Sequence, residues 1–137
     1  MGFKETVQTI ISKHTETKEN HTDKELRTHY YKSTKDKVIK EIENMFNQRP
    51  GFSVSSVSEE RGEIIVNINK GKKAMMVVTV IMVRPFRTAV DFSIATDTML
   101  FSDFGYSRKL AAELYKELNK RLTFVGTGLG DELTKSW

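Results

Sequence analysis

The chain has 137 residues, no cysteine, and a net charge of +4 from 22 basic and 18 acidic side chains. This length suits one domain whose core needs no disulfide or metal to hold it. The absence of cysteine excludes disulfides, thiolate nucleophiles and cysteine-ligated zinc. The small positive excess is spread along the chain, which is typical of a solubilising surface and argues against nucleic acid as the partner.

The first 23 residues form a polar segment without the apolar core of a secretion signal. Four apolar side chains in it share one helical face: Phe3, Val7, Ile10 and Ile11. This spacing predicts a short helix over residues 4–13. Residues 14–23 contain no apolar side chain, so we expect a flexible link there and a folded domain over residues 24–126. With no apolar run long enough to span a membrane, we expect a cytoplasmic protein.

One strand and one helix are expected at the start of the domain. Residues 25–32 alternate weakly and end in two tyrosines, which favours an edge strand. Thr34 then offers a hydroxyl cap, and the apolar residues that follow it have the spacing of one helical face: Val38, Ile39, Ile42, Met45 and Phe46. We predict a helix over residues 34–47 that ends before Pro50.

Four further strands are expected, at residues 52–57, 63–69, 74–83 and 88–95. The segments between them are short enough for hairpins, which predicts an antiparallel meander. Residues 74–83 are apolar on both faces, as in an internal strand that is covered on both sides.

The last element is a long helix with a leucine stripe formed by Leu110, Leu114, Leu118 and Leu122. We expect Ser102 or Asp103 to cap it and Gly126 to end it, with residues 127–137 as a tail. The predicted fold class is α+β in the order β-α-β4-α, an antiparallel sheet with two helices on one face. TATA-binding-protein-like and helix-grip folds use a similar order, and this likeness of fold carries no function.

The segment that opens the last helix resembles a known motif. Asp103 and Gly105 match the Asp-x-Gly-x-Asn pattern of the bacterial and plastid family designated domain of unknown function number fourteen ninety-nine, while Ser107 stands where that family has Asn. The likeness covers residues 37–122. Because that family has no settled activity, the resemblance implies a fold rather than a role.

The titratable residues form no recognisable catalytic set. His14, His21 and His29 are seven and eight residues apart, and we interpret them as solvated side chains because the polar residues between them favour neither a helix nor a core. Asp97 and Asp103 lack a histidine or lysine placed to work with them. We therefore expect a binding function rather than an enzyme, with no catalytic residue, metal or cofactor.

Two apolar regions are candidate binding surfaces. Met99, Leu100, Phe101 and Phe104 lie in a connection that should be polar, so they either pack beneath the last helix or form the rim of a ligand cleft. On the sheet face away from the helices, an apolar patch is expected at Ile65, Val77, Ile81 and Ala89. Such a patch needs a cover, which the N-terminal segment, a second copy of the chain or another protein could supply.

Three functions follow from these surfaces, in order of preference. The first is a protein-interaction module, a homodimer included, that acts through the apolar sheet face. The second is a carrier or enzyme for a small apolar ligand held under the last helix. The third is a nucleic-acid-associated protein.

Overall fold

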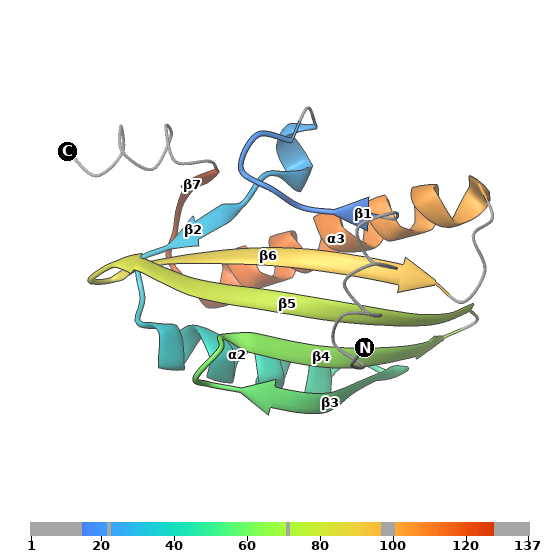
Figure 1. Ribbon diagram of the computed structural model, residues 1–137, viewed down its shortest axis with the longest axis horizontal. Coiled ribbons are helices and arrows are strands. Elements are labelled where there is room, and N and C mark those ends of the chain that lie inside the picture. Colours follow the sequence, from blue (N-terminus) through green and yellow to red (C-terminus); the bar gives the residue numbers. More distant parts are fainter. Residues whose placement is uncertain (1–14, 22, 71, 97–100, 128–137) are drawn as a thin grey trace, which may run out of the picture.

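The computed structural model describes residues 15–21, 23–70, 72–96 and 101–127, which form one antiparallel sheet and two α-helices (Figure 1). The elements are β1 (Thr15–Glu16), the 3-10 turn η1 (Lys24–Leu26), β2 (His29–Tyr31), α2 (Lys35–Asn47), β3 (Phe52–Ser58), β4 (Glu63–Lys70), β5 (Lys72–Arg84), β6 (Arg87–Thr96), α3 (Phe101–Arg121) and β7 (Phe124–Thr127). The strand order is β3-β4-β5-β6-β2-β7, and β1 also pairs with β6. The predicted α+β class is confirmed.

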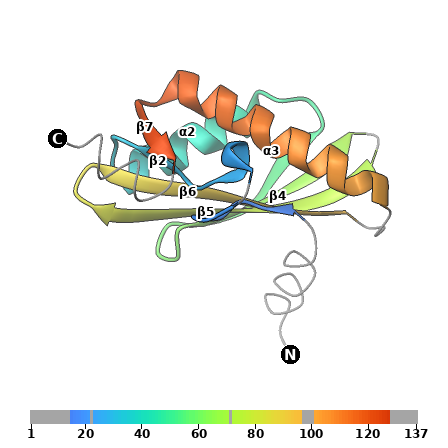
Figure 2. The ribbon, with the colours of Figure 1, turned by 90° about the horizontal axis from the view of Figure 1, so that it is seen from above.

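Both helices cover the same face of the sheet, as Figure 2 shows in edge view. We call this the helix face and the opposite one the outer face. Helix α2 begins after Thr34, whose hydroxyl accepts a hydrogen bond from the Lys37 amide at 3.4 Å. Its apolar stripe is buried from Val38 to Phe46, which confirms the predicted helix. No helix in the described part of the chain is long and apolar enough to cross a membrane.

The predicted meander is present as β3 to β6, with β5 paired on both sides. Its alternation divides the side chains between the two faces, and Ile64, Val78 and Phe92 are fully buried on the helix face. The turn before β4 contains Gly62 at φ 69°, where a Cβ atom would lie 2.1 Å from the Val80 carbonyl oxygen. Only glycine fits there.

Helix α3 lies across the sheet with Leu114 and Leu118 fully buried. It begins at Phe101, so Ser102 and Asp103 both lie within its first turn, and the prediction that one of them caps the helix is wrong. It ends at Arg121 rather than at Gly126. Gly126 instead belongs to β7 and faces Tyr30 across the β2–β7 ladder.

Strand β7 changes the position of β2 in the sheet. Residues 25–32 were expected to be an edge strand, and this is wrong because β2 lies between β6 and β7. The first part of the same segment is the 3-10 turn η1, which Asp23 caps by accepting a hydrogen bond from the Glu25 amide. All three β2 residues are buried.

The folded domain also begins earlier than residue 24. Strand β1 pairs with the last part of β6, with Glu16 opposite Ser93, whereas β2 pairs with the first part of β6. Thr17 lies between these two ladders, and its amide donates a hydrogen bond to the Phe92 carbonyl oxygen at 2.9 Å. The expectation of a flexible link is therefore wrong for residues 15–21.

Candidate functional site

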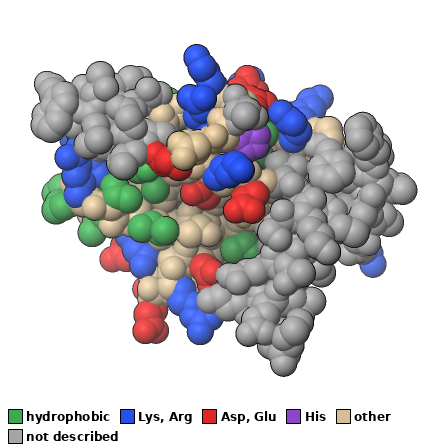
Figure 3. Space-filling model, turned by 45° about the horizontal axis from the view of Figure 1, so that its top comes forward, with side chains coloured by type: hydrophobic (Ala, Val, Ile, Leu, Met, Phe, Trp, Pro, Cys, Tyr) green, Lys and Arg blue, Asp and Glu red, His purple; other side chains and the backbone are tan. Residues whose placement is uncertain are grey.

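The exposed large hydrophobic side chains of the described residues gather at one end of the sheet. They are Ile81, Met82, Val83 and Phe86, with exposed fractions of 52%, 45%, 45% and 59%. The first three lie near the C-terminal end of β5, and Phe86 lies in the turn that leads to β6. Hydrophobic side chains are visible at this end in Figure 3, on the side where Figure 1 places the β5–β6 hairpin. We call these four residues the hairpin patch.

Phe86 has an unusual backbone. Its φ of 58° lies in the left-handed region, where among the described residues it is the one non-glycine. This region disfavours a residue with a Cβ atom, and a bulky aromatic side chain is a costly choice for it. Arg84 and Arg87 flank the turn, so the exposed ring lies between two cationic side chains in the sequence.

The four residues predicted as an interface differ in exposure. Ile81 is exposed, Ile65 and Val77 are half-buried, and Ala89 is only 7% exposed. Ile65 lies opposite Val77 and Ile81 opposite Ala89, so they form two cross-strand pairs on the outer face. The polar row of Thr79 with Asp91 separates the two pairs. The exposed apolar surface is thus displaced towards the hairpin.

The residues predicted to rim a ligand cleft cannot be placed in one. Met99 and Leu100 lie outside the described residues. Phe101 and Phe104 belong to the first turns of α3, where the structure describes the backbone alone. Further along α3, Leu110, Leu114 and Leu118 are buried against the sheet.

A cleft of about 400 Å³ lies on the outer face, between the β1 segment and the strands β5 and β6. The cleft residues are Glu16, Thr17, Lys18, Glu19, Thr28, Tyr30, Thr79, Ile81, Val83, Ala89, Asp91 and Ser93. Ile81 and Val83 belong both to this cleft and to the hairpin patch. The two features therefore form one continuous surface.

Asp91 is a half-buried acid in this cleft. Its Oδ1 atom accepts a hydrogen bond from the Thr28 hydroxyl at 2.8 Å and lies 2.8 Å from the Thr17 hydroxyl oxygen. Burial raises the pKa of Asp91 above the ordinary value for aspartate, and the negative charges of Glu19 and Glu16 act in the same direction. The two threonine hydroxyls oppose this rise in pKa.

Thr17 connects Asp91 to the helix face. Its Oγ1 atom accepts a hydrogen bond from the Phe92 amide at 2.8 Å and lies 2.9 Å from the hydroxyl oxygen of Tyr115 on α3. That hydroxyl is also 2.7 Å from the Val90 carbonyl oxygen. Thr17 and Tyr115 are both buried, so the β1 segment is tied to α3 through the sheet.

His29 packs against the same tyrosine. Its ring is stacked on Tyr115 and only 6% of the residue is exposed, so the interpretation of His29 as a solvated side chain is wrong. Burial lowers the pKa of His29 from 6.5 to about 4, against a hydrogen bond to the Arg27 carbonyl oxygen that raises it. The neutral ring is therefore the form that fits this site.

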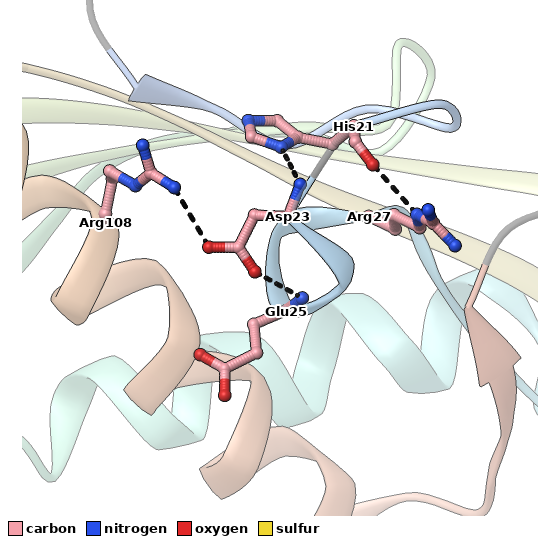
Figure 4. A network of polar contacts seen from close by, with 5 residues as sticks. All are labelled: His21, Asp23, Glu25, Arg27 and Arg108. Carbon is pink, nitrogen blue, oxygen red and sulfur yellow. Dashed lines mark hydrogen bonds and ion pairs between the residues drawn. The ribbon is translucent and has the colours of Figure 1, made fainter.

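The connection from β1 to β2 is held by a second polar network (Figure 4). Arg108 on α3 donates to the Asp23 carboxylate at 3.0 Å, and Arg27 donates to the His21 carbonyl oxygen at 2.8 Å. The Glu25 amide and then Arg108 hold the pKa of Asp23 below its usual value. These contacts hold the loop between β1 and β2 against α3.

Sequence reasoning missed Asp91, Thr17 and Tyr115 as a group. Asp91 falls within the predicted strand over residues 88–95, and Thr17 within the predicted flexible link over residues 14–23. Within the described ranges, no three His, Asp or Glu side chains come together in a metal-binding group.

No family model, curated protein or solved structure matches the chain, so the family resemblance stays a prediction.

Proposed function

We propose that this protein is an interaction module that binds another protein through the hairpin patch. The observation that carries the proposal is that the large exposed hydrophobic residues of the described chain all belong to one hairpin, Ile81 to Phe86. Scattered exposed apolar residues are ordinary, whereas apolar residues that gather at one end of a sheet are typical of interaction surfaces; here Ile81 and Val83 lie on the outer face, and Phe86 lies in the adjoining turn.

The backbone at Phe86 supports the same proposal. Asparagine or glycine would adopt a φ of 58° at lower cost, so the phenylalanine at this position opposes the local conformational preference. Backbone strain of this kind is concentrated at functional positions. An exposed aromatic ring on a narrow turn is also suited to enter a pocket, and such aromatic anchors dominate many interfaces.

The expected partner has an apolar pocket with an acidic rim. Phe86 would fill the pocket, and Ile81 and Val83 would extend the contact along the outer face. Arg84 and Arg87 bracket Phe86 in the sequence, and the turn between them contains no acid. Carboxylates around the pocket would complement these arginines and favour this partner over a neutral surface.

The experiment places a photoreactive benzoylphenylalanine at position 86 in one variant and at Ser53 in a control variant. Ser53 is exposed on the same sheet face but lies on β3, at the far edge. The cross-linked protein is identified by mass spectrometry, purified, and titrated with the wild type and with Phe86→Ser. We expect cross-linking at position 86 alone and at least tenfold weaker binding by Phe86→Ser.

Three outcomes would contradict the proposal. Equal cross-linking from positions 86 and 53 would show that the hairpin patch is not the binding surface, as would unchanged binding by Phe86→Ser. A cross-link only to a second copy of the chain would assign the patch to a homodimer rather than to a different protein.

A small apolar ligand is the second candidate, and the outer-face cleft is the observation that favours it. Its volume of about 400 Å³ falls in the range of small-molecule sites. Ile81, Val83 and Ala89 provide apolar walls beside the carboxyl group of Asp91. Titrating indole or cyclohexanol into the labelled protein should shift the amide signals of Ala89 and Asp91, and unchanged signals at millimolar ligand would exclude this function.

A further inference from the structure

Four oxygen atoms form a row of hydrogen-bond contacts that leads from the cleft to α3. Asp91 Oδ1 and Thr17 Oγ1 are 2.8 Å apart, Thr17 Oγ1 and the Tyr115 hydroxyl oxygen 2.9 Å, and the Tyr115 hydroxyl and the Val90 carbonyl oxygen 2.7 Å. Each distance is that of a hydrogen bond between oxygens. Three full hydrogen bonds would use three hydrogen atoms, one between each pair of oxygens.

The side chains supply too few hydrogens if Asp91 is ionised. The hydroxyls of Thr17 and Tyr115 provide one hydrogen each, and the Val90 carbonyl provides none. The Phe92 amide hydrogen is already directed to Thr17 Oγ1 at 2.8 Å. With a carboxylate at position 91, Thr17 donates its hydrogen to Asp91, and the one hydrogen of the Tyr115 hydroxyl has to be shared between Thr17 Oγ1 and the Val90 carbonyl oxygen, which weakens both of these bonds in a buried site.

We propose that Asp91 stays a protonated carboxylic acid in the folded protein over a pH range in which a free aspartate is already ionised, and that its proton holds the β1 segment on the sheet. With a carboxylate, Thr17 donates to Asp91 and Tyr115 donates to Thr17. Protonation reverses both bonds, so the acid donates to Thr17, Thr17 donates to Tyr115, and Tyr115 donates to the Val90 carbonyl oxygen. Thr17 then accepts from Asp91 and from the Phe92 amide, so its hydroxyl uses its one hydrogen and both lone pairs. Thr28 still donates to Asp91 Oδ1.

The charges around Asp91 agree with this assignment. Glu16 and Glu19 from the β1 segment disfavour a second negative charge, and Lys18 is the one cation among the cleft residues. Tyr30 on β2, whose hydroxyl donates to Glu19, and Tyr115 on α3 are the other titratable groups nearby. Glu63 on β4 lies in the same cross-strand row, on the far side of Thr79.

The proton makes the β1 segment sensitive to pH. Strand β1 has only two residues, and Thr17 provides its buried attachment. Burial raises the pKa of Asp91, so the proton is lost only as the pH rises above the ordinary aspartate range. Ionisation then leaves the Tyr115 hydrogen shared between Thr17 and the Val90 carbonyl oxygen, which weakens the attachment of Thr17 to α3. Residues 16–19 line the outer-face cleft, so loosening them alters access to it.

The test follows the ¹³C signal of the Asp91 carboxyl carbon by NMR from about pH 3 to about pH 9, in the wild type and in Tyr115→Phe. The wild-type carboxyl group should titrate clearly above the ordinary value. In Tyr115→Phe two contacts disappear, Thr17 becomes free to donate to a carboxylate, and the pKa of Asp91 should fall. Burial alone predicts the opposite, because phenylalanine makes the site less polar.

Amide exchange provides the second measurement. The protection factors of Thr17 and Lys18 should decrease in the wild type over the pH range in which Asp91 ionises. In Asp91→Asn the side chain is neutral at every pH and offers an N–H donor. The protection factors of Thr17 and Lys18 should therefore stay constant across this pH range. An ordinary or lower pKa for Asp91, an unchanged or higher pKa in Tyr115→Phe, or the same exchange step in Asp91→Asn would overturn the proposal.

Discussion

The imidazole ring of His29 is stacked on the phenol ring of Tyr115, with ring centroids 3.6 Å apart and planes 6° from parallel. The two residues are distant in the chain, and their contact joins β2 to α3 within the helix face. Tyr115 also reaches Thr17 and Val90 through its hydroxyl group. One tyrosine therefore connects the histidine, the N-terminal strand and the long helix.

The stability of the protein should decrease in mild acid because of His29. Its pKa falls from 6.5 when unfolded to about 4 when folded, so its contribution is fully present above pH 6.5 and is lost as the pH falls towards about 4. The loss should approach about 3 kcal/mol, since one pKa unit corresponds to about 1.4 kcal/mol.

Urea unfolding at several pH values, with His29→Phe as the comparison, measures this contribution. The phenylalanine ring can keep the stack on Tyr115 but cannot titrate. Asp91 contributes with the opposite sign, because its raised pKa favours the fold at low pH, and it is present in both proteins. An equal acid loss in the wild type and in His29→Phe would refute the role of His29.

Leu114 and Leu118 should be anchors of the core. Both are fully buried in the middle of α3, so truncating either to alanine leaves a cavity. We expect each variant to lose about 2 to 5 kcal/mol in chemical denaturation. Lys116→Ala, on the exposed side of the same helix, should change stability by less than about 0.5 kcal/mol. Small losses at both leucines would indicate an open cleft beneath α3.

Thr17→Val should destabilise the fold although it lies near the start of the chain. Valine has a similar shape but leaves the Phe92 amide without its side-chain acceptor and breaks the contact to Tyr115. We expect a loss of about 1 to 3 kcal/mol. Asn20→Ala, at an exposed position in the same segment, is the control and should be nearly neutral. Equal stability of the two variants would restore the view of this segment as a passive linker.

Phe86→Asn should stabilise the isolated protein while it weakens partner binding. Asparagine tolerates the left-handed conformation that Phe86 adopts, so thermal unfolding should show a gain of up to about 1 kcal/mol. Phe86→Ala removes the ring but keeps the Cβ atom that disfavours the left-handed conformation. The gain in stability should therefore be smaller for alanine than for asparagine. If both variants lose stability, the Phe86 ring contributes to the fold rather than to an interface.

Local periodicity predicted most of the scaffold. The stripes of α2 and α3 and the alternation of β3 to β6 are long enough to be recognised within one segment. Strands β1 and β7, with two and four residues, are too short to show a period. Their formation depends on pairing with β6 and β2, which no local pattern reveals.

The candidate site was harder to predict than the scaffold. Thr17 and Asp91 are 74 residues apart in the chain, and Thr17 and Tyr115 are 98 apart. Nothing in either neighbourhood marks these residues as partners. The sequence analysis recognised Ile81 as an apolar surface residue. It did not predict that the exposed patch is displaced towards Phe86, because which part of the outer face is covered depends on tertiary packing.

The central claim is that the hairpin patch is the binding surface, and methyl NMR of the labelled protein with the cross-linked partner tests it most directly. The methyl signals of Ile81, Met82 and Val83 should shift or broaden on addition of the partner, while those of the buried Ile64 and Ile68 stay in place. Perturbation confined to α3 or β3, with the Ile81 and Val83 signals unchanged, would contradict the account.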